Sequence, residues 1–185
     1  MLVWRVFPWV GGAGAGRPGH PLHVHPDQGA GRWDNPDRYL AFYAAASAEA
    51  AVGESFAHLT AWTARMLPFP QLEGAVRALG VYRYDEEAHP LLDLDDAKAL
   101  LERGLRPTEV VIRNRPRTQA IARAVHDEGR WAGIRWWSMH RPQWPLMAFF
   151  GTAPLAVEDV VDLPGHPAVR DAAAVLAKEV DAALR

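Results

Sequence analysis

The sequence contains no cysteine in 185 residues. Disulfide bonds, zinc sites built from thiolates and thiol catalysis are therefore excluded. The chain also lacks a long apolar run: its apolar stretches are short and interrupted, so the sequence predicts no membrane-spanning segment. Positive charge is not in excess, because 20 Lys and Arg residues face 22 Asp and Glu residues. Binding to nucleic-acid phosphates depends on clustered cations, so we expect no direct nucleic-acid partner and no membrane partner.

The N-terminal decapeptide MLVWRVFPWV lacks the basic start and the small-residue cleavage site of a signal peptide. Residues 2–9 carry bulky β-forming side chains instead, which predicts a first strand that Pro8 ends. We expect a cytoplasmic protein.

The overall composition is that of a globular protein, with 49% apolar and 23% charged residues. A chain of this length fits one domain with a substantial core, so we expect a single compact domain over residues 1–185. Strand and helix patterns are mixed without regular alternation. This order favours an α+β fold, with a mixed β-sheet flanked by helices, over a doubly wound parallel sheet.

Alternating apolar residues and turn signals predict further strands, at residues 39–45, 81–94 (as one or two strands), 108–114, 132–140 and 146–151. Periodic apolar positions and capping residues predict helices, at residues 48–66, 95–104, 117–130 and 166–184. Ser47 offers a cap to the first of these helices, and Gly104 and Gly129 end the second and third.

An arginine, Arg32, stands in the Gly/Pro/Asn-rich turn GRWDNPDRY, residues 31–39. A loop arginine beside glycines can present its guanidinium to a phosphate while the backbone comes close. Most arginines are solvated or brace their own loop, so the pattern alone favours that interpretation.

Glu54 lies in the predicted helix 48–66, whose apolar stripe includes Val52 and Phe56. On a helical wheel Glu54 falls roughly opposite Val52, on the side of His58. Periodicity alone therefore makes Glu54 a solvated glutamate with His58 as its i,i+4 neighbour. A chemical role requires that this face, or its N-terminal end, lines a cleft.

Ser138 ends the segment IRWWS, in which alternation places Ile134, Trp136 and Ser138 on one strand face. Its hydroxyl can bond a neighbouring backbone group, or it can donate a hydrogen bond in an aromatic-walled pocket, and the pattern leaves both open. No histidine and aspartate at a nucleophile elbow accompany it, so a serine-hydrolase triad is disfavoured.

The histidines His20, His23 and His25 in HPLHVHP raise the question of a metal site, since His23 and His25 would share one face of a strand. The segment is rich in proline and has no third ligand at a fixed helical spacing, so a metal site is disfavoured. The glycine-rich segment 10–19 resembles a phosphate-binding loop only superficially, because no Lys-Ser/Thr pair follows it.

Taken in order along the chain, these residues resemble the RES-domain family, which is named for an arginine, a glutamate and a serine. The likeness covers about residues 3–155. It includes the opening WRVF strand, the Gly-Arg-aromatic turn, the Tyr-x-Ala-x-Ser strand-to-helix junction and the glutamate in the following helix. On this match Arg32, Glu54 and Ser138 correspond to the three named residues, and Tyr43 corresponds to the pocket tyrosine. The family often has Tyr-Pro before the serine, where this chain has two tryptophans.

The resemblance implies a fold similar to that of ADP-ribosyltransferases and an activity that consumes NAD. RES proteins are known as toxins of bacterial toxin–antitoxin pairs, and members break the bond between nicotinamide and ribose with water or phosphate as acceptor. NAD is then the substrate, and no metal or prosthetic group is implied. The usual partner is an Xre-type helix-turn-helix antitoxin that blocks the active site, and a homodimer is left open.

On this resemblance Glu54 would stabilise the oxocarbenium-like ribose, and Arg32 would bind the pyrophosphate. Tyr43 and Trp33 would form a stacking wall for nicotinamide, and Ser138 would orient the ligand by a hydrogen bond. We expect catalytic roles for Glu54, Arg32 and Tyr43, and NAD-binding roles for Arg32, Trp33, Tyr43 and Ser138. For Glu54 this requires the helix to run along the rim of the cleft.

Two alternatives stay open. Some family members transfer ADP-ribose to a protein, and the sequence does not separate that acceptor from water or phosphate. The chain could also be a catalytically idle module that binds a nucleotide or another protein, although the presence of all three signature residue types weighs against this.

Overall fold

A computed structural model describes residues 1–184 of the chain. The chain divides into two compact units, each assembled from separated stretches of sequence. Unit 1 comprises Met1, Val24–Ala44 and Tyr84–Leu155, and unit 2 comprises Leu2–His23, Ala45–Arg83 and the chain from Ala156 onward. An element that crosses a boundary is assigned to the unit that holds most of its residues.

Unit 1 contains four strands, hydrogen-bonded in the order β5-β6-β7-β2. They are β2 (Ala41–Ala45), β5 (Leu91–Asp93), β6 (Gly133–Trp137) and β7 (Pro145–Phe150). β5 pairs with β6 in parallel, and β6 pairs with β7 antiparallel, so the strands of this unit form a mixed arrangement. Three helices lie between β5 and β6 in the sequence: α2 (Ala97–Glu102), α3 (Pro107–Val111) and α4 (Arg115–Asp127).

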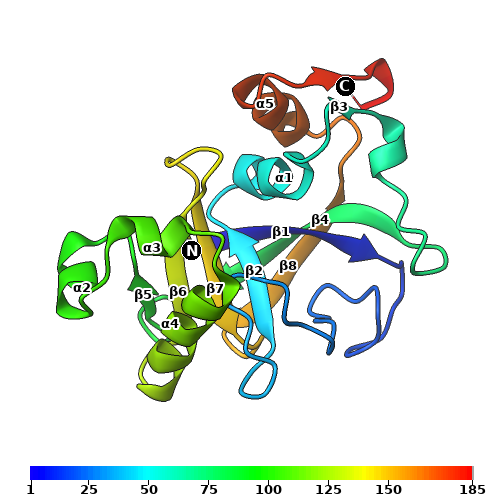
Figure 1. Cartoon of the computed structure of the whole chain (residues 1–185). Helices are drawn as coiled ribbons and strands as arrows, with labels where there is room; N and C mark the ends of the chain where they lie inside the picture. The colour runs from blue at the N-terminus through cyan, green and yellow to red at the C-terminus, as the bar shows by residue number, and fades with distance from the viewer. Residues whose placement is uncertain (185) are drawn as a thin grey trace. The chain divides into compact units, whose positions relative to one another are not determined.

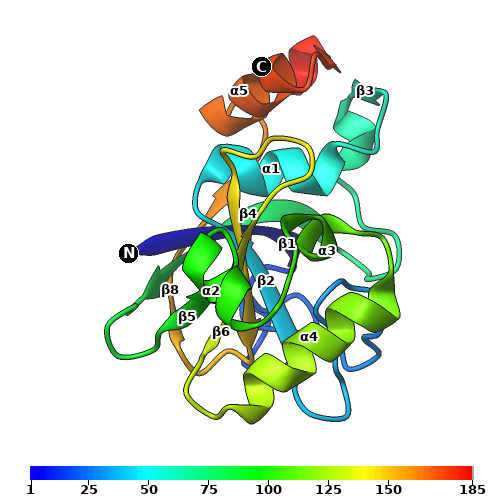
Figure 2. The same cartoon turned by 60° about the vertical axis from the view of Figure 1, so that its left-hand side comes forward.

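Helix α4 packs against β6 with one face (Figure 2). The buried residues of this helix recur at intervals of three and four residues: Thr118, Ile121, Ala122 and Val125. On β6, Ile134 and Trp136 are buried while the residues between and after them are less so, as expected when alternate side chains point to opposite faces. Local periodicity thus predicts both sides of this contact.

Three strands of unit 2 are hydrogen-bonded in the order β1-β4-β8: β1 (Leu2–Trp9), β4 (Val76–Tyr84) and β8 (Leu155–Asp162). β1 and β4 pair antiparallel along their length, from Leu2 opposite Arg83 to Trp9 opposite Val76. A separate parallel pair joins β3 (Ala61–Trp62) to β9 (Glu179–Val180). The helical elements are α1 (Ala48–Phe56), α5 (Pro167–Val175) and two 3₁₀ turns, η1 (Ala64–Met66) and η2 (Ala182–Leu184).

Helix α1 is covered on two sides within unit 2, by β1 and by α5 (Figure 1). Ser47 is its N-cap, because the Ser47 hydroxyl accepts a hydrogen bond from the Ala50 N–H. Its buried residues include the small Ala51 and Gly53 as well as the larger Val52 and Phe56. Small side chains allow two neighbours to approach one helix, so its buried residues do not form a single stripe.

The structure confirms most of the predicted elements. The strands predicted at 2–9, 39–45, 132–140 and 146–151 correspond to β1, β2, β6 and β7, and the segment 81–94 holds the end of β4 and all of β5. The helices predicted at 95–104 and 117–130 correspond to α2 and α4. The fold is α+β, with helices packed on a mixed sheet. That residues 1–185 form a single domain stays a prediction.

The segment 108–114, whose pattern predicts a strand, forms helix α3 instead. Pro107 stands in the first helical turn, where its missing N–H and fixed φ suit a helix. The Glu109 carboxylate accepts a hydrogen bond from the Arg106 N–H and so satisfies a backbone donor at the helix start. Burial of Val110 compensates for the weak helix preference of a β-branched side chain.

Two helices are shorter than the sequence predicts. α1 ends at Phe56 rather than residue 66, and the Trp62 indole N–H donates to the Phe56 carbonyl from the following strand β3. α5 ends at Val175 rather than residue 184, because Ala177 adopts a left-handed φ of 51° before β9 begins. Strand β8 is not predicted at all, since most of its side chains are exposed and show no alternation. Within residues 1–184, no helix combines the length and apolar character that crossing a membrane requires.

Candidate active site

The turn that carries Arg32 is built around the carboxylate of Asp34, a residue that is 5% exposed. Asp34 Oδ2 accepts hydrogen bonds from the backbone N–H groups of Gly29 (2.9 Å) and Gly31 (2.7 Å). Asp34 Oδ1 accepts one from the Tyr43 hydroxyl at 2.7 Å. A buried carboxylate needs such donors, because an unsatisfied charge in the interior is costly. Asp34 thus ties the turn to strand β2.

The Tyr43 hydroxyl is also an acceptor, from the Trp33 backbone N–H at 2.9 Å. Burial, followed by the hydrogen bond to the Asp34 carboxylate, raises the pKa of Tyr43 far above its ordinary value. The hydroxyl therefore stays protonated at neutral pH and holds the turn in place. The part of Tyr43 suited to contact a ligand is its ring, which is only partly buried.

Side chains from helix α4 hold the same turn by its carbonyl groups. Gln119 donates from Nε2 to the carbonyls of Gly29 (2.8 Å) and Gly31 (2.9 Å). Arg115 donates from Nε to the Ala30 carbonyl at 3.1 Å. Both the N–H and the C=O groups of the turn are thus bonded to side chains. Its conformation is set by the protein itself, which is the condition for a pre-organised site.

Arg32 projects from this turn to the C-terminal end of α3. Its guanidinium donates to the carbonyls of Val110 (2.9 Å), Val111 (3.2 Å) and Ile112 (2.5 Å). The last carbonyls of a helix carry partial negative charge, which a guanidinium compensates. Arg32 therefore braces α3, a distant element, and not its own loop. Its predicted contact with a phosphate stays a prediction.

Trp33 follows Arg32 and has no exposed surface. Its ring meets the Trp136 ring edge-on with centroids 5.4 Å apart, and Trp136 meets Tyr43 in the same way at 6.3 Å. These three rings form an aromatic cluster that joins the turn, β2 and β6. In this structure Trp33 has no face open to a ligand. Its place beside Tyr43 in a stacking wall for nicotinamide stays a prediction.

Ser138 continues the covered face of β6 beyond Trp136 and is fully buried. Its Oγ accepts hydrogen bonds from the N–H groups of His140 (2.9 Å) and Arg141 (3.2 Å), and its own N–H donates to the Trp144 carbonyl (2.9 Å). These bonds close the connection between β6 and β7, a common use of a serine hydroxyl. Hydrogen bonding of Ser138 to a ligand stays a prediction.

Glu54 belongs to unit 2, where it lies near the C-terminal end of α1 and is partly buried. The helical wheel predicts a solvated glutamate, and the structure shows partial burial in a helix that contacts both β1 and α5. His58, the expected i,i+4 neighbour, is exposed and lies beyond the end of the helix at Phe56. Unit 1 brings Trp33 and Tyr43 together with Asp34 and Trp136. It also contains Arg32, whose guanidinium lies at the end of α3, and Ser138, which lies in the connection between β6 and β7.

The histidine-rich segment is not a strand. His20 and His25 each accept a hydrogen bond through Nδ1 from the N–H two residues ahead, at Leu22 and Asp27 respectively. These bonds close local turns. Across residues 1–184, no group of three His, Asp or Glu side chains is arranged to hold a metal ion.

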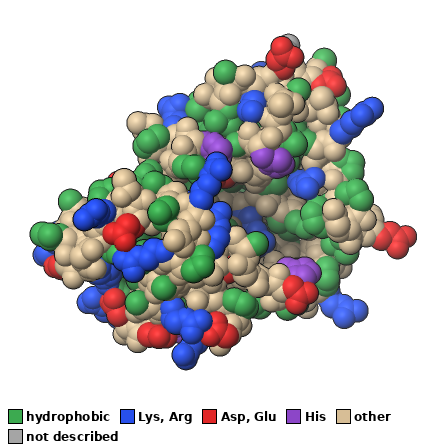
Figure 3. Space-filling view, in the orientation of Figure 1, with side chains coloured by type: hydrophobic (Ala, Val, Ile, Leu, Met, Phe, Trp, Pro, Cys, Tyr) green, Lys and Arg blue, Asp and Glu red, His purple; other side chains and the backbone are tan. Residues whose placement is uncertain are grey.

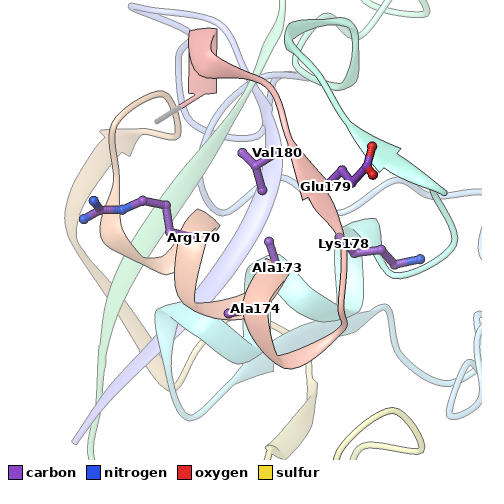
Figure 4. A pocket seen from close by; sticks show the side chains of 6 residues that line it. All are labelled: Arg170, Ala173, Ala174, Lys178, Glu179 and Val180. Atoms are coloured by element: carbon purple, nitrogen blue, oxygen red, sulfur yellow. The ribbon is translucent and has the colours of Figure 1, made fainter.

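An open pocket of about 740 Å³ lies within unit 2, beside α5 and β9 (Figure 4). The residues that line it are Arg170, Ala173, Ala174, Lys178, Glu179 and Val180. In Figure 4 the side chains of Arg170 and Lys178 extend outward on opposite sides of the two alanines. No predicted site residue lines this pocket, so it adds nothing to the candidate active site.

Charged side chains of both signs cover the part of unit 1 that contains α2, α3 and α4 (Figure 3). Several of them form ion pairs: Arg103 with Glu128 at 2.7 Å, Arg117 with Glu109 at 2.8 Å, and Arg123 with Asp37 at 2.9 Å. Arg103, Arg117 and Arg123 are therefore each matched by a carboxylate.

Comparison with known proteins identifies the family. The family model of the RES domain matches residues 2–171. The chain belongs to the RES-domain family. Among solved structures, this RES-domain protein is similar to a chain in the crystal structure of the M. tuberculosis MbcT–MbcA toxin–antitoxin complex. The two chains are 19% identical with a TM-score of 0.54, and the match covers 88% of this chain and 83% of the other. At this identity the likeness concerns the fold.

No curated protein matches this RES-domain chain. The family match contains Arg32, Glu54 and Ser138, and it extends past the predicted motif range 3–155 into α5. The resemblance that the sequence indicates is therefore confirmed at the level of the family.

Sequence reasoning misses two residues that hold the Arg32 turn: Asp34, within the turn, and Gln119, on α4. Asp-Asn-Pro is typical of a turn, and nothing local indicates that its aspartate is buried. The available signal is the spacing Gly29-x-Gly31-x-x-Asp34, since an aspartate can bond the N–H groups of glycines just before it. Gln119 lies 88 residues from Gly31 in the chain, so only the tertiary structure shows their contact.

Proposed function

We propose that this RES-domain protein degrades NAD by cleaving the bond between nicotinamide and ribose, with water or phosphate as acceptor, as the toxin of a toxin–antitoxin pair. The observation that carries the proposal is the RES-domain match over residues 2–171, a range that holds Arg32, Glu54 and Ser138, the residues that we assign to the family's named trio. The fold likeness to a chain of a toxin–antitoxin complex supports it. The proposed partner is an Xre-type helix-turn-helix antitoxin that blocks the site.

Glu54 is assigned the central role in this reaction. As the bond to nicotinamide breaks, positive charge develops on the ribose, and a nearby carboxylate lowers the energy of that transition state. Partial burial of Glu54 strengthens such an effect, because charges interact more strongly where water is scarce. Nicotinamide leaves as a neutral base, the acceptor water bonds to the ribose carbon, and one proton passes to solvent.

Arg32, Tyr43 and Ser138 are assigned to binding. A guanidinium suits the pyrophosphate of NAD because it is permanently charged and offers several donors. The ring of Tyr43 supplies a stacking surface, which Trp33 supports from the interior through Trp136. Ser138 is assigned a hydrogen bond that orients the ligand.

The test is to incubate the purified protein with NAD, with and without phosphate, and to separate the products by chromatography. The wild-type protein is expected to release nicotinamide, and the second product identifies the acceptor. Glu54→Gln, which keeps the size of the side chain, is expected to lower the rate by about 100-fold or more. Glu73→Gln is the matched control, because Glu73 is exposed in the same unit, and its rate should equal that of wild type.

Nicotinamide release that is equal in wild type and Glu54→Gln would remove Glu54 from the mechanism. No release from folded wild-type protein would reject the NAD-degrading activity. Incubation with labelled NAD and a cell extract would then test whether ADP-ribose is transferred to a protein.

A further inference from the structure

The two residues that flank Arg32 are held by one pair of side chains. Gly31 precedes Arg32, and its N–H donates to Asp34 Oδ2 at 2.7 Å. Trp33 follows Arg32, and its N–H donates to the Tyr43 hydroxyl at 2.9 Å. The Tyr43 hydroxyl in turn donates to Asp34 Oδ1 at 2.7 Å. Both flanks of Arg32 are therefore connected to one carboxylate.

The surroundings of Asp34 make this connection rigid. Asp34 is 5% exposed, so water competes little for its oxygens. A side chain at position 31 would overlap both Asp34 Oδ1 and the Tyr43 oxygen, so the turn closes tightly on the carboxylate. Burial, with the neighbouring carboxylate, raises the pKa of Tyr43, which keeps its O–H a hydrogen-bond donor at neutral pH.

We propose that Asp34 is a positioning residue, which fixes the backbone on both sides of Arg32 and thereby holds Arg32 where its guanidinium, bonded to the last carbonyls of α3, also meets the anionic part of the dinucleotide. The identity of the ligand rests on the proposed function. The statement that Asp34 fixes the turn rests on the hydrogen bonds alone. Asp34 is buried beneath the turn, so it acts through Arg32 and Tyr43 and not on the ligand itself.

The variant that tests this is Asp34→Asn, which keeps the shape but replaces one acceptor oxygen with an NH₂ donor. An asparagine can serve either the glycine N–H groups or the Tyr43 hydroxyl with its single oxygen, and it faces the other with a donor. The matched control is Asp37→Asn, because Asp37 is exposed three residues further along the chain. The KM for NAD is expected to rise about tenfold in Asp34→Asn and to stay unchanged in Asp37→Asn.

A second measurement separates positioning from a general loss of folded protein. Loss of folded protein lowers the apparent kcat and leaves KM unchanged, whereas misplacement of Arg32 raises KM. If Asp34 acts through Arg32, adding Asp34→Asn to Arg32→Ala raises KM no further than Arg32→Ala alone. An unchanged KM in Asp34→Asn, or effects on KM that multiply in the double variant, would overturn the proposal.

A third measurement does not depend on NAD. Amide hydrogen exchange at Gly29, Gly31 and Trp33 reports directly on the bonds that Asp34 and Tyr43 make. These amides are expected to exchange about tenfold faster or more in Asp34→Asn than in Asp37→Asn, while those in the centre of α4 keep their rates. Equal exchange in the two variants would overturn the proposal whatever reaction the protein performs. If the wild-type protein does not cleave NAD but these amides exchange faster in Asp34→Asn, the proposed function is rejected. The result still shows that Asp34 fixes the turn.

Discussion

Position 31 shows how closely a single residue governs the Arg32 turn. The hydrogen atom of Gly31 faces Asp34 and Tyr43 where a methyl group would overlap an oxygen of each. Gly31→Ala is therefore expected to lower the free energy of unfolding by about 1–3 kcal/mol, because it forces apart a buried hydrogen bond. Urea denaturation of the two proteins measures this difference.

Gly14→Ala is the matched substitution, because nothing lies within 4 Å of the position its Cβ would take. Gly14→Ala is expected to change the free energy of unfolding by no more than about 0.5 kcal/mol. Equal stability of Gly31→Ala and Gly14→Ala would show that the turn relaxes without cost and that the Asp34–Tyr43 bond does not constrain it.

At the scale of elements, helix α3 shows where local patterns are insufficient. The two valines of α3 and the isoleucine that follows it suit a strand. Only Pro107 and the carboxylate acceptor of Glu109 favour a helix start. The deciding contact comes from outside the segment, since Arg32 bonds its last carbonyls. The periodicity of the sequence does not predict a short helix whose last carbonyls are capped by an arginine from a distant turn.

The start of α3 yields a prediction about pH. The hydrogen bond from the Arg106 N–H, followed by that from the Arg117 side chain, lowers the pKa of Glu109 below its ordinary 4.5. A carboxyl group whose pKa is lower in the folded than in the unfolded protein stabilises the folded state at pH values above its unfolded pKa. This stabilisation is lost as the pH falls through its folded pKa. Glu109→Gln is therefore expected to melt below wild type at pH 7, with a difference that shrinks below about pH 4.5.

Thermal melting of both proteins from pH 7 to pH 3 is the measurement. Glu102→Gln, measured in parallel, shows the effect of removing an exposed carboxylate from the neighbouring helix α2. A melting difference for Glu109→Gln that persists undiminished at pH 3 would contradict an ionic origin.

For the whole molecule, sequence reasoning reaches the family and the fold class but not the arrangement of side chains. The order of the Arg32 turn, Glu54 and Ser138 indicates the RES family, which the family match confirms. The helical wheel does not reach the partial burial of Glu54, because it assumes one covered face, whereas α1 contacts both β1 and α5. Local patterns also do not reach the burial of Trp33, whose ring contacts Trp136 about a hundred residues away in the chain.

A prediction at the same scale concerns the cell. If the protein is an NAD-degrading toxin, its induced expression in a bacterium is expected to lower total NAD and arrest growth, and Glu54→Gln at equal protein level should do neither. Enzymatic NAD assays on lysed cells provide the measurement. Co-expression with the product of an adjacent helix-turn-helix gene should restore both NAD and growth. Growth arrest by wild type and Glu54→Gln alike, with NAD unchanged, would point to a different target.

The discontinuous make-up of the two units has a consequence for protein engineering. A cut between residues 83 and 84 leaves pieces of both units on each fragment, because the chain enters unit 1 again at Tyr84 after passing through unit 2. Neither fragment then contains a complete unit, so neither can fold into one by itself. The two halves would have to reassemble in two places at once, because each unit needs residues from both fragments.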